Sequence, residues 1–255
     1  MKTVNDGSSE FYFDRLTGGA TIGRFGALDV PGLVHGVTTL KGFDTVLAAT
    51  DGGAAAMNFA DVLGVDGAAW LDQVHGTSSI IVDSPGAAGS ADGLITESPG
   101  LALVGRSADC PLVLVSDSGG GVVGMFHAGW RGATAGMGME FIRQFVGHFD
   151  SAPGGLVACI CPSVGLCCYE VGQDVQDSAV AGLGAHAVKF FAYLKGKLHF
   201  DMQACICDQL LRVGLSRHNV HVAGVCTICH EDLFCSYRRQ GALAGRFLAA
   251  IARSV

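Results

Sequence analysis

The sequence predicts a mixed α/β fold, formed by a single domain that spans residues 1–255. Short apolar segments typical of β-strands outnumber the helical segments, and the two kinds do not alternate as they do in a purely parallel α/β sheet. No linker, internal repeat or low-complexity tract divides the chain, and 255 residues are within the range of one large domain. We therefore expect one mixed domain in which strands dominate.

Strands are predicted where short apolar runs lie between turn-forming residues. In chain order, these runs lie near 11–13 and at 34–39, 46–50, 79–82, 94–96, 101–104, 111–115, 121–126, 156–160 and 220–225. Helices are predicted at 53–63, 66–71, 131–149, 174–181, 201–213 and 246–252. Gly136 and Gly138 weaken the third of these helices, whereas Asp201 is placed to cap the fifth and Gly214 to end it.

Composition excludes several classes of protein. Hydrophobic residues make up 49% of the chain and charged residues 15%, yet the longest charge-free run contains prolines and glycines that would interrupt a membrane helix. The net charge of −7, with no basic cluster, argues against binding to nucleic acid. The first ten residues lack the apolar segment of an export signal, so a cytoplasmic location is expected.

Ten cysteines are present, and in a chain of this size without an export signal most are expected to be reduced and buried. Cys226, Cys229 and His230 match the CxxCH pattern of covalent haem attachment, which the cytoplasmic expectation disfavours. The spacing of another group matches no common zinc module, and packing in the core is the expected role of its members, Cys159, Cys161, Cys167 and Cys168.

The stretch from Ala108 to Gly132 holds most of the chemically active residues. Its two apolar strands are joined by a glycine-rich turn at 118–121, with Cys110 at the start of the first strand and His127 at the end of the second. Antiparallel pairing would place these two ends roughly 5 Å apart at Cα. A thiol and an imidazole in that position indicate either a metal site or a nucleophile with its base.

Neighbouring residues fit both interpretations. His75 would complete a set of two histidines and one cysteine, and three ligands with an open fourth position describe a catalytic zinc site; the alternative is that Cys110 packs as a small apolar residue. Arg131 follows His127 by four residues at a helix entry, which suits an anion, although a surface salt bridge would also explain it. Asp109 is a candidate acid or base, or a group that supports a ligand.

Several common signatures are absent. The chain has no GxSxG, GxxxxGK[ST] or HExxH motif, no GxGxxG after a strand, and no HxE…PCxxC pattern of zinc deaminases. It also has only nine histidines and no HxH pair, so four-electron oxidation by several coppers is not expected. Copper uptake by the thiolate and imidazole groups would be adventitious.

The chain resembles the YfiH family, also called laccase-domain or polyphenol oxidase-like proteins. The motifs that carry the resemblance occur in the family's order: QVHG at 73–76, ADG at 91–93, SADCP at 107–111, HAGWRG at 127–132, CCYEVG at 167–172, CT at 226–227, SYRRQG at 236–241 and GR at 245–246. The resemblance implies packed mixed β-sheets flanked by helices, related to cysteine-hydrolase-like domains.

The resemblance also implies an activity and its residues. His75, Cys110 and His127 match the family's zinc ligands, and the implied reaction is phosphorolysis of adenosine, inosine or methylthioadenosine, with adenosine deamination as a further activity. Cys110, His127 and Asp109 are then expected to be catalytic, and Arg131 and Gln73 to bind substrate and phosphate. The alternatives are a cysteine amidohydrolase that edits peptidoglycan precursors, and a metal-binding member that has lost activity.

The N-terminal third departs from the family pattern. Arginines that family members carry there are missing near 38–43 and 58–59, and Lys41 is a partial substitute for one of them. This departure is what makes an inactive member a credible alternative. The three expected metal ligands lie outside the region concerned.

Overall fold

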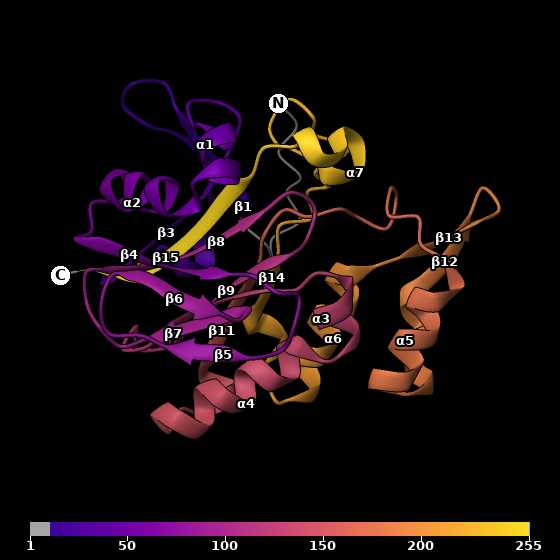
Figure 1. Ribbon diagram of the computed structural model, residues 1–255. Helices are drawn as coiled ribbons and strands as arrows, with labels where there is room; N and C mark the ends of the chain where they lie inside the picture. The colour runs from indigo at the N-terminus through magenta and orange to yellow at the C-terminus, as the bar shows by residue number, and fades with distance from the viewer. Residues whose placement is uncertain (1–10, 255) are drawn as a thin grey trace.

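Two large β-sheets are stacked face to face in the computed structural model, which describes residues 11–254, and helices cover both outer faces (Figure 1). The seven-stranded sheet has the order β1 (Phe11–Arg15), β2 (Thr21–Phe25), β3 (Leu33–Thr38), β15 (Phe247–Arg253), β8 (Leu101–Ser107), β4 (Gly67–Asp72), β6 (Gly86–Ser90). The six-stranded sheet has the order β14 (Val220–Val222), β11 (Leu156–Ile160), β9 (Leu112–Asp117), β10 (Val123–His127), β7 (Gly93–Thr96), β5 (Ser79–Ile81).

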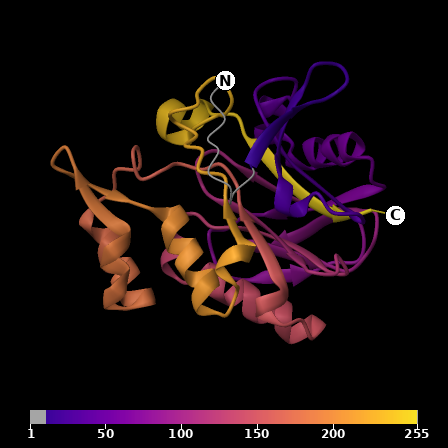
Figure 2. The same ribbon diagram turned by 180° about the vertical axis from the view of Figure 1, so that it is seen from behind.

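The helices are divided between the two outer faces. Against the seven-stranded sheet lie α1 (Thr45–Thr50) and α2 (Gly52–Leu63), and the six-stranded sheet is covered by α4 (Met137–Phe149) and α6 (Met202–Arg212). Figure 2 shows the remaining larger elements grouped at one end of the sandwich, where α5 (Gln173–Leu183) lies beside the small hairpin of β12 (Phe191–Leu194) and β13 (Lys197–Phe200). The short helices are α3 (Trp130–Thr134) and α7 (Tyr237–Gln240).

Because side chains alternate along a strand, one strand contributes residues to two different hydrophobic cores. In β9, Leu112 and Leu114 point into the core between the sheets, whereas Val113 and Val115 join the core beneath α4 and α6. The seven-stranded sheet likewise shares its outer face with α2, where Phe59 packs against alanine and valine side chains of the strands. Both sheets are therefore apolar on both faces, which explains why half of this sequence is hydrophobic without a membrane span.

The predicted mixed fold with packed sheets flanked by helices is confirmed, and most predicted elements are present. Three were assigned the wrong type. Residues 46–50 form helix α1 rather than a strand, because the carboxylate of Asp44 accepts hydrogen bonds from the N–H groups of Val46 and Leu47 and caps the helix. Residues 66–71 and 246–252 are not helices but the strands β4 and β15.

Both misassigned strands are rich in alanine. Alanine favours helices locally, but β4 pairs with β6 and β8, and β15 pairs with β3 and β8, so each has a neighbour on both edges. Figure 1 shows the yellow β15, from the end of the chain, between strands drawn in indigo and purple from its first half. These pairings join residues far apart in the sequence, and no local pattern reveals them.

The predicted helix at 131–149 is interrupted. Gly136 adopts a φ of 89°, which ends α3 after five residues and begins α4 in a new direction. The strands β2, β6, β12 and β13 and the helix α7 were not predicted. Within residues 11–254, no helix combines the length and apolarity needed to cross a bilayer.

His35 is a buried histidine that takes part in the fold of the seven-stranded sheet. Its Nε2 accepts a hydrogen bond from the backbone N–H of Phe25 at 2.8 Å, and its side chain is 1% exposed. Burial lowers the pKa of His35 to about 4, although the nearby Asp29 carboxylate opposes the shift. The neutral ring is therefore the form that fits the folded protein.

Stability should fall in acid because of His35. Between its unfolded pKa of 6.5 and its folded pKa of about 4, the unfolded chain binds more protons, so stability decreases as the pH falls. We expect the wild type to lose about 3 kcal/mol relative to a His35→Gln variant, whose amide oxygen can accept the same bond without titrating. Urea unfolding of both proteins from pH 7 to pH 4 measures this difference, and parallel curves would contradict it.

Candidate metal centre and active-site cavity

The three predicted metal ligands meet at one end of the six-stranded sheet. The ligand atoms of His75, Cys110 and His127 all lie within 4.8 Å of one another. His127 ends β10, His75 lies in the loop after β4, and Cys110 lies in the loop before β9. The rings of the two histidines are nearly perpendicular, at 85°, with centroids 4.9 Å apart.

The strand register differs from the simplest expectation. His127 pairs with Leu112, and the N–H of Ala128 donates to the carbonyl of Pro111, so Cys110 is not directly opposite His127. The thiol reaches the site because the chain turns at Asp109, whose φ is 100°. The two side chains therefore meet through the loop before β9 rather than through strand pairing.

Asp92 holds this site together and was not predicted. Its carboxylate is fully buried and accepts from His127 Nδ1 at 2.8 Å and from the backbone N–H groups of His75 and Gly76 at 3.0 and 2.5 Å. Burial opposes ionisation of Asp92, but the hydrogen bonds from His127, Gly76 and His75 outweigh it and lower its pKa. With Nδ1 bound to the carboxylate, His127 presents Nε2 to the metal position.

This arrangement fits a transition metal. Two imidazoles and a thiolate are ligands of zinc sites that keep an open fourth position, and metal-binding histidines commonly donate their other nitrogen to a carboxylate. Asp92 lies in the Ala-Asp-Gly motif at 91–93, immediately before β7. The signal that could have identified it is the need of a ligand histidine for such a partner.

The backbone around the ligands is tightly constrained. His75 has a φ of 61°, a value that costs free energy for residues other than glycine and that needs support from its surroundings. The hydrogen bonds to Asp92 provide that support. Gly129 leaves no room for a side chain, because an added Cβ would lie 2.4 Å from His75 Cδ2 and 3.2 Å from Cys110 Sγ. The ligands thus occupy the space that any other residue at 129 would need.

The ionisation of Cys110 and His127 is coupled. Burial disfavours the thiolate, but the hydrogen bonds and charges of His127 and His75 outweigh it and lower the pKa of Cys110 to about 6. Burial also disfavours a charged His127, whereas Asp92 and Cys110 raise its pKa to about 9. Without a metal, the pair therefore favours thiolate and imidazolium, which is the form of an activated nucleophile.

Asp109 lines the cavity beside the candidate metal ligands, and its carboxylate accepts three hydrogen bonds from the protein. It accepts from Thr227 Oγ1 at 2.6 Å, Ser236 Oγ at 3.0 Å and the backbone N–H of Arg238 at 2.7 Å. These bonds join the loop before β9 to the segments after β14 and before α7. The acid–base role predicted for Asp109 stays a prediction, while a role in holding these segments follows from its contacts.

A cavity of about 640 Å³ opens over the metal centre, a size typical of small-molecule sites. Four arginines line it, and none of them forms a salt bridge to a carboxylate among the described residues: Arg106, Arg131, Arg238 and Arg246. The sequence predicts an anion-binding role for Arg131, with Arg238 and Arg239 as further candidates for positive charge in the pocket or for a solvated surface. Tertiary folding brings the other three to it from β8, α7 and the segment before β15.

Two of these arginines lie on aromatic rings. The Arg131 guanidinium is 4.3 Å from the ring centre of Trp130, and that of Arg238 is 5.0 Å from the ring centre of Tyr169. Stacking of this kind holds a guanidinium in place and leaves its N–H groups free at the edge. The helix that contains Arg131 is only five residues long, so positive charge in the cavity comes from side chains more than from a helix terminus.

Gln73 also lines the cavity, but its amide is bonded to the backbone. Its Oε1 accepts from the N–H of Arg106 and its Nε2 donates to the carbonyl of the same residue, both at 2.9 Å. This pair of bonds ties the loop after β4 to β8. The substrate-binding role predicted for Gln73 stays a prediction, whereas a role in joining these two segments follows from its contacts.

The fold and motifs agree with comparisons to known proteins. A family model described as multi-copper polyphenol oxidoreductase laccase matches residues 49–254. The chain belongs to this family, the YfiH family. The crystal structure of YlmD from Geobacillus stearothermophilus matches 96% of this chain and all of its own with a TM-score of 0.86 and 27% identity. YfiH from Bacillus licheniformis matches 89% of this chain and 98% of its own, with a TM-score of 0.79 and 26% identity.

Curated YfiH-family relatives carry a purine nucleoside phosphorylase name. One from Bacteroides thetaiotaomicron is 35% identical over 63% of this chain, and YlmD is 33% identical over 71%. These alignments span 60% and 65% of the relatives' own lengths. A relative from Streptomyces griseus with the same activity in its name is 32% identical over 94% of each chain.

Loss of the Asp92 carboxylate should weaken metal binding. An Asp92→Asn variant loses the negative charge and one of the two acceptor oxygens. The amide therefore cannot accept all three hydrogen bonds, and His75 and His127 lose their orientation. We expect the affinity for added Zn²⁺ to fall about 10- to 100-fold, as measured by competition with a chromogenic chelator. Asp117→Asn, in the turn between β9 and β10, is the matched control and should bind Zn²⁺ as the wild type does. Equal affinities for both variants would argue against the assigned role.

Proposed function

We propose that this protein is a zinc-dependent purine nucleoside phosphorylase. One observation carries the proposal: a single cavity contains a three-ligand metal centre, four arginines without acidic partners, and aromatic side chains at its rim. The names of the curated relatives support the reaction class. Phosphorolysis needs an anion site, a site for a planar base and a group that acts on the sugar or base, and the cavity offers residues for each.

Phosphate would bind to the arginine side chains. Arg131 and Arg238 are held on Trp130 and Tyr169, with their N–H edges available for charge-assisted, two-point hydrogen bonds to phosphate oxygens. Arg246 donates to the carbonyls of Ala244 and Gly245, which fixes it at the cavity wall. This cluster also supplies positive charge in place of the arginines that the N-terminal third lacks.

The purine would lie against the aromatic residues at the cavity mouth. Trp130, Tyr169 and Tyr237 line the cavity, and Tyr237, which is 55% exposed, is the ring on which a base could stack. Base stacking on such rings contributes about 1–3 kcal/mol and tolerates different bases. The cavity therefore favours a class of purine nucleosides, of which adenosine, inosine and methylthioadenosine are the candidates.

Zinc would be held by His75, Cys110 and His127, and when bound it would act as a Lewis acid towards an oxygen of the substrate or a water. Asp92, bonded to His127 Nδ1, would leave Nε2 of that ring directed at the metal position. Arginines would hold the attacking phosphate, and Asp109 is the candidate acid or base that acts on the purine. Activation of a water at the same open position would account for adenosine deamination as a second activity.

A specific observation favours one alternative. Cys110, His127 and Asp92 form a thiol–imidazole–carboxylate series, and the low pKa of Cys110 favours its thiolate. In the absence of metal this is the arrangement of a cysteine amidohydrolase, for which peptidoglycan precursors are the proposed substrates. The two functions make opposite demands on the metal: phosphorolysis as proposed requires zinc, and a thiolate nucleophile requires its absence.

The proposal predicts base release that depends on both phosphate and zinc. Zinc-loaded protein should release free purine from adenosine, inosine or methylthioadenosine only when phosphate is present, as followed by chromatography. Cys110→Ala should abolish this release and lower bound zinc by one ion per chain, because the centre loses its thiolate. Cys207→Ala, on α6, is the control and should retain both properties. Base release without phosphate, or amide cleavage that rises on zinc removal, would overturn the proposal.

A substitution at Arg131 should affect phosphate more than zinc. Lysine keeps the positive charge but cannot form two parallel hydrogen bonds or stack on Trp130 in the same way. For Arg131→Lys we expect the half-saturating phosphate concentration to rise roughly tenfold to a hundredfold, equivalent to about 1.5–3 kcal/mol, with zinc content unchanged. Arg143→Lys, on the exposed face of α4, is the matched control. Unchanged phosphate dependence, or loss of zinc, would make Arg131 a structural residue.

A further inference from the structure

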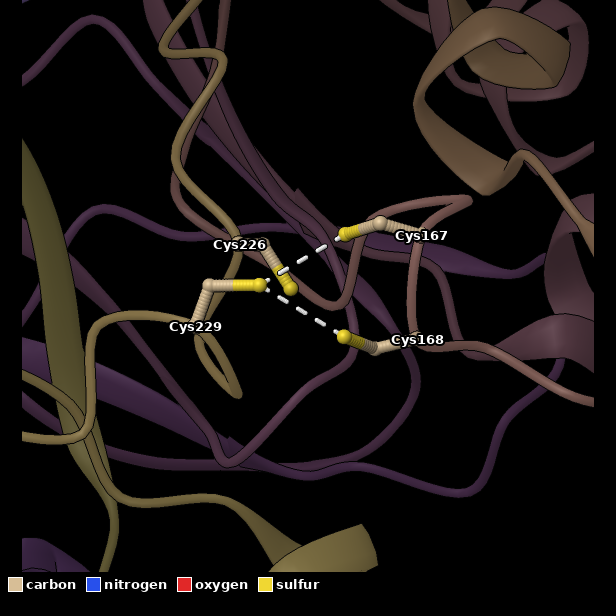
Figure 3. Close-up of side chains that lie close together, drawn as sticks. All are labelled: Cys167, Cys168, Cys226 and Cys229. Atoms are coloured by element: carbon tan, nitrogen blue, oxygen red, sulfur yellow. Dashed lines mark hydrogen bonds between the residues drawn. The ribbon is translucent and has the colours of Figure 1, made fainter.

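A second group of metal-binding side chains lies outside the cavity. The sulfur atoms of four cysteines all lie within 4.8 Å of one another: Cys167, Cys168, Cys226 and Cys229. Figure 3 shows the sulfurs pointing towards a common centre from two different loops. Sequence analysis expected Cys167 and Cys168 to pack in the core, but Cys167 is exposed and Cys168 is only partly buried. The packing interpretation is therefore wrong for Cys167 and holds only in part for Cys168, which packs against the edge of the core, whereas Cys159 and Cys161 are buried as expected.

We infer that Cys167, Cys168, Cys226 and Cys229 bind one structural Zn²⁺ through four thiolates. A tetrahedral Zn²⁺ with Zn–S bonds of about 2.3 Å separates its sulfurs by about 3.8 Å. Cys229 Sγ lies 3.7 Å from Cys167 Sγ and 3.5 Å from Cys168 Sγ. These separations match the edges of such a tetrahedron, and a set of four ligands leaves no open position for substrate.

A disulfide explains the cluster less well. Sulfurs in a disulfide are about 2.05 Å apart, and each forms only one such bond. Cys229 is nearly equidistant from Cys167 and Cys168, so it is placed to share a ligand with both rather than to pair with either. The CxxC pair formed by Cys226 and Cys229 has the spacing found in zinc-binding turns.

Backbone hydrogen bonds close both loops into tight turns and stabilise the thiolate of Cys226, whereas burial and the neighbouring sulfurs raise the pKa of Cys168 to about 11 in the absence of an ion. The N–H of Gly165 donates to Cys226 Sγ at 3.3 Å, and the N–H groups of Cys168 and Tyr169 close a tight turn on the Gly165 carbonyl. In the second loop, the N–H of His230 closes a turn on the carbonyl of Cys226. Burial disfavours the Cys226 thiolate, but N–H groups of Gly165, Cys229 and Ile228 outweigh this and lower its pKa.

Positive charge lies close to one of the two loops. Arg239 Nη1 donates to the carbonyls of Thr227 and Ile228, the two residues between Cys226 and Cys229, at 3.3 Å each. A centre of one Zn²⁺ and four thiolates carries a net charge of about −2, since each thiol releases its proton on binding. The guanidinium would partly compensate for that charge.

The position of the cluster indicates what the ion would do. It joins the loop between β11 and α5, which contributes Tyr169 to the cavity, to the loop after β14, which contacts the cavity residue Asp109. Tyr169, next to Cys168, lies beneath Arg238, and Thr227, next to Cys226, donates to Asp109. A Zn²⁺ here would fix one wall of the cavity without contacting substrate, and its presence does not depend on the proposed activity.

Zinc analysis of four proteins tests this inference separately from the catalytic centre. We expect about two Zn²⁺ per chain in the wild type, one in Cys110→Ala, one in Cys229→Ser and none in the double variant. X-ray absorption of zinc-loaded Cys110→Ala should then show four sulfur ligands at about 2.3 Å. Cys229→His should retain the ion, since histidine can replace one thiolate, and Cys207→Ser should not change the zinc content.

Other outcomes would overturn it. One is a zinc content that Cys229→Ser leaves unchanged, and another is nitrogen or oxygen ligands in the Cys110→Ala spectrum. The others are iron or copper in place of zinc, and a disulfide among the four cysteines in unreduced protein analysed by mass spectrometry. Failure of the catalytic centre alone gives a different pattern, with one sulfur-bound Zn²⁺ in both the wild type and Cys110→Ala. The Cys110→Ala spectrum leaves all four cysteines of the cluster unchanged, so this part of the test does not depend on how well a variant of the cluster folds.

Discussion

The buried carboxylate of Asp92 is the constraint on which the metal centre depends. A charge with no exposed surface is costly unless hydrogen bonds compensate for it, and Asp92 obtains them from both ligand histidines and from Gly76. The same bonds orient His127 and support the unusual backbone of His75. One side chain thus joins the end of β10 to the loop after β4, and the open metal position is a consequence of that junction.

Asp109 has a comparable role on the opposite side of the cavity. Its three hydrogen bonds connect the loop before β9 to Thr227, Ser236 and Arg238, and its own backbone is held at a φ of 100°. Two buried aspartates, Asp92 and Asp109, therefore determine where the surrounding loops lie. The cysteine cluster would add a third fixed point, at the base of the loops that carry Tyr169 and Thr227.

The charge in the cavity is opposite in sign to the net charge of the chain. The net charge is −7, yet the cavity gathers four arginines that have no carboxylate partners among the described residues. Such a pocket attracts anions locally while the remaining surface is acidic. The contrast supports a small anionic substrate. The net charge of the chain does not reveal such a pocket, and by itself it argued only against nucleic acid as a partner. The contrast also shows that the arginines missing from the N-terminal third are not the only source of positive charge available to the site.

Local pattern determined the hairpin of β9 and β10 and most helices, and it pointed to the three candidate metal ligands that the fold brings together, because alternation, caps and motif residues act over a few positions. It misjudged β4 and β15, where alanine-rich segments become strands only through pairing with distant neighbours. Asp92, Arg106 and Arg246 were missed for the same reason, since each gains its role from a contact made across the fold. The cysteines at 167, 168, 226 and 229 show this most clearly: the spacing of Cys226 and Cys229 alone resembles a binding motif, and only the meeting of two loops brought all four sulfurs to within 4.8 Å of one another.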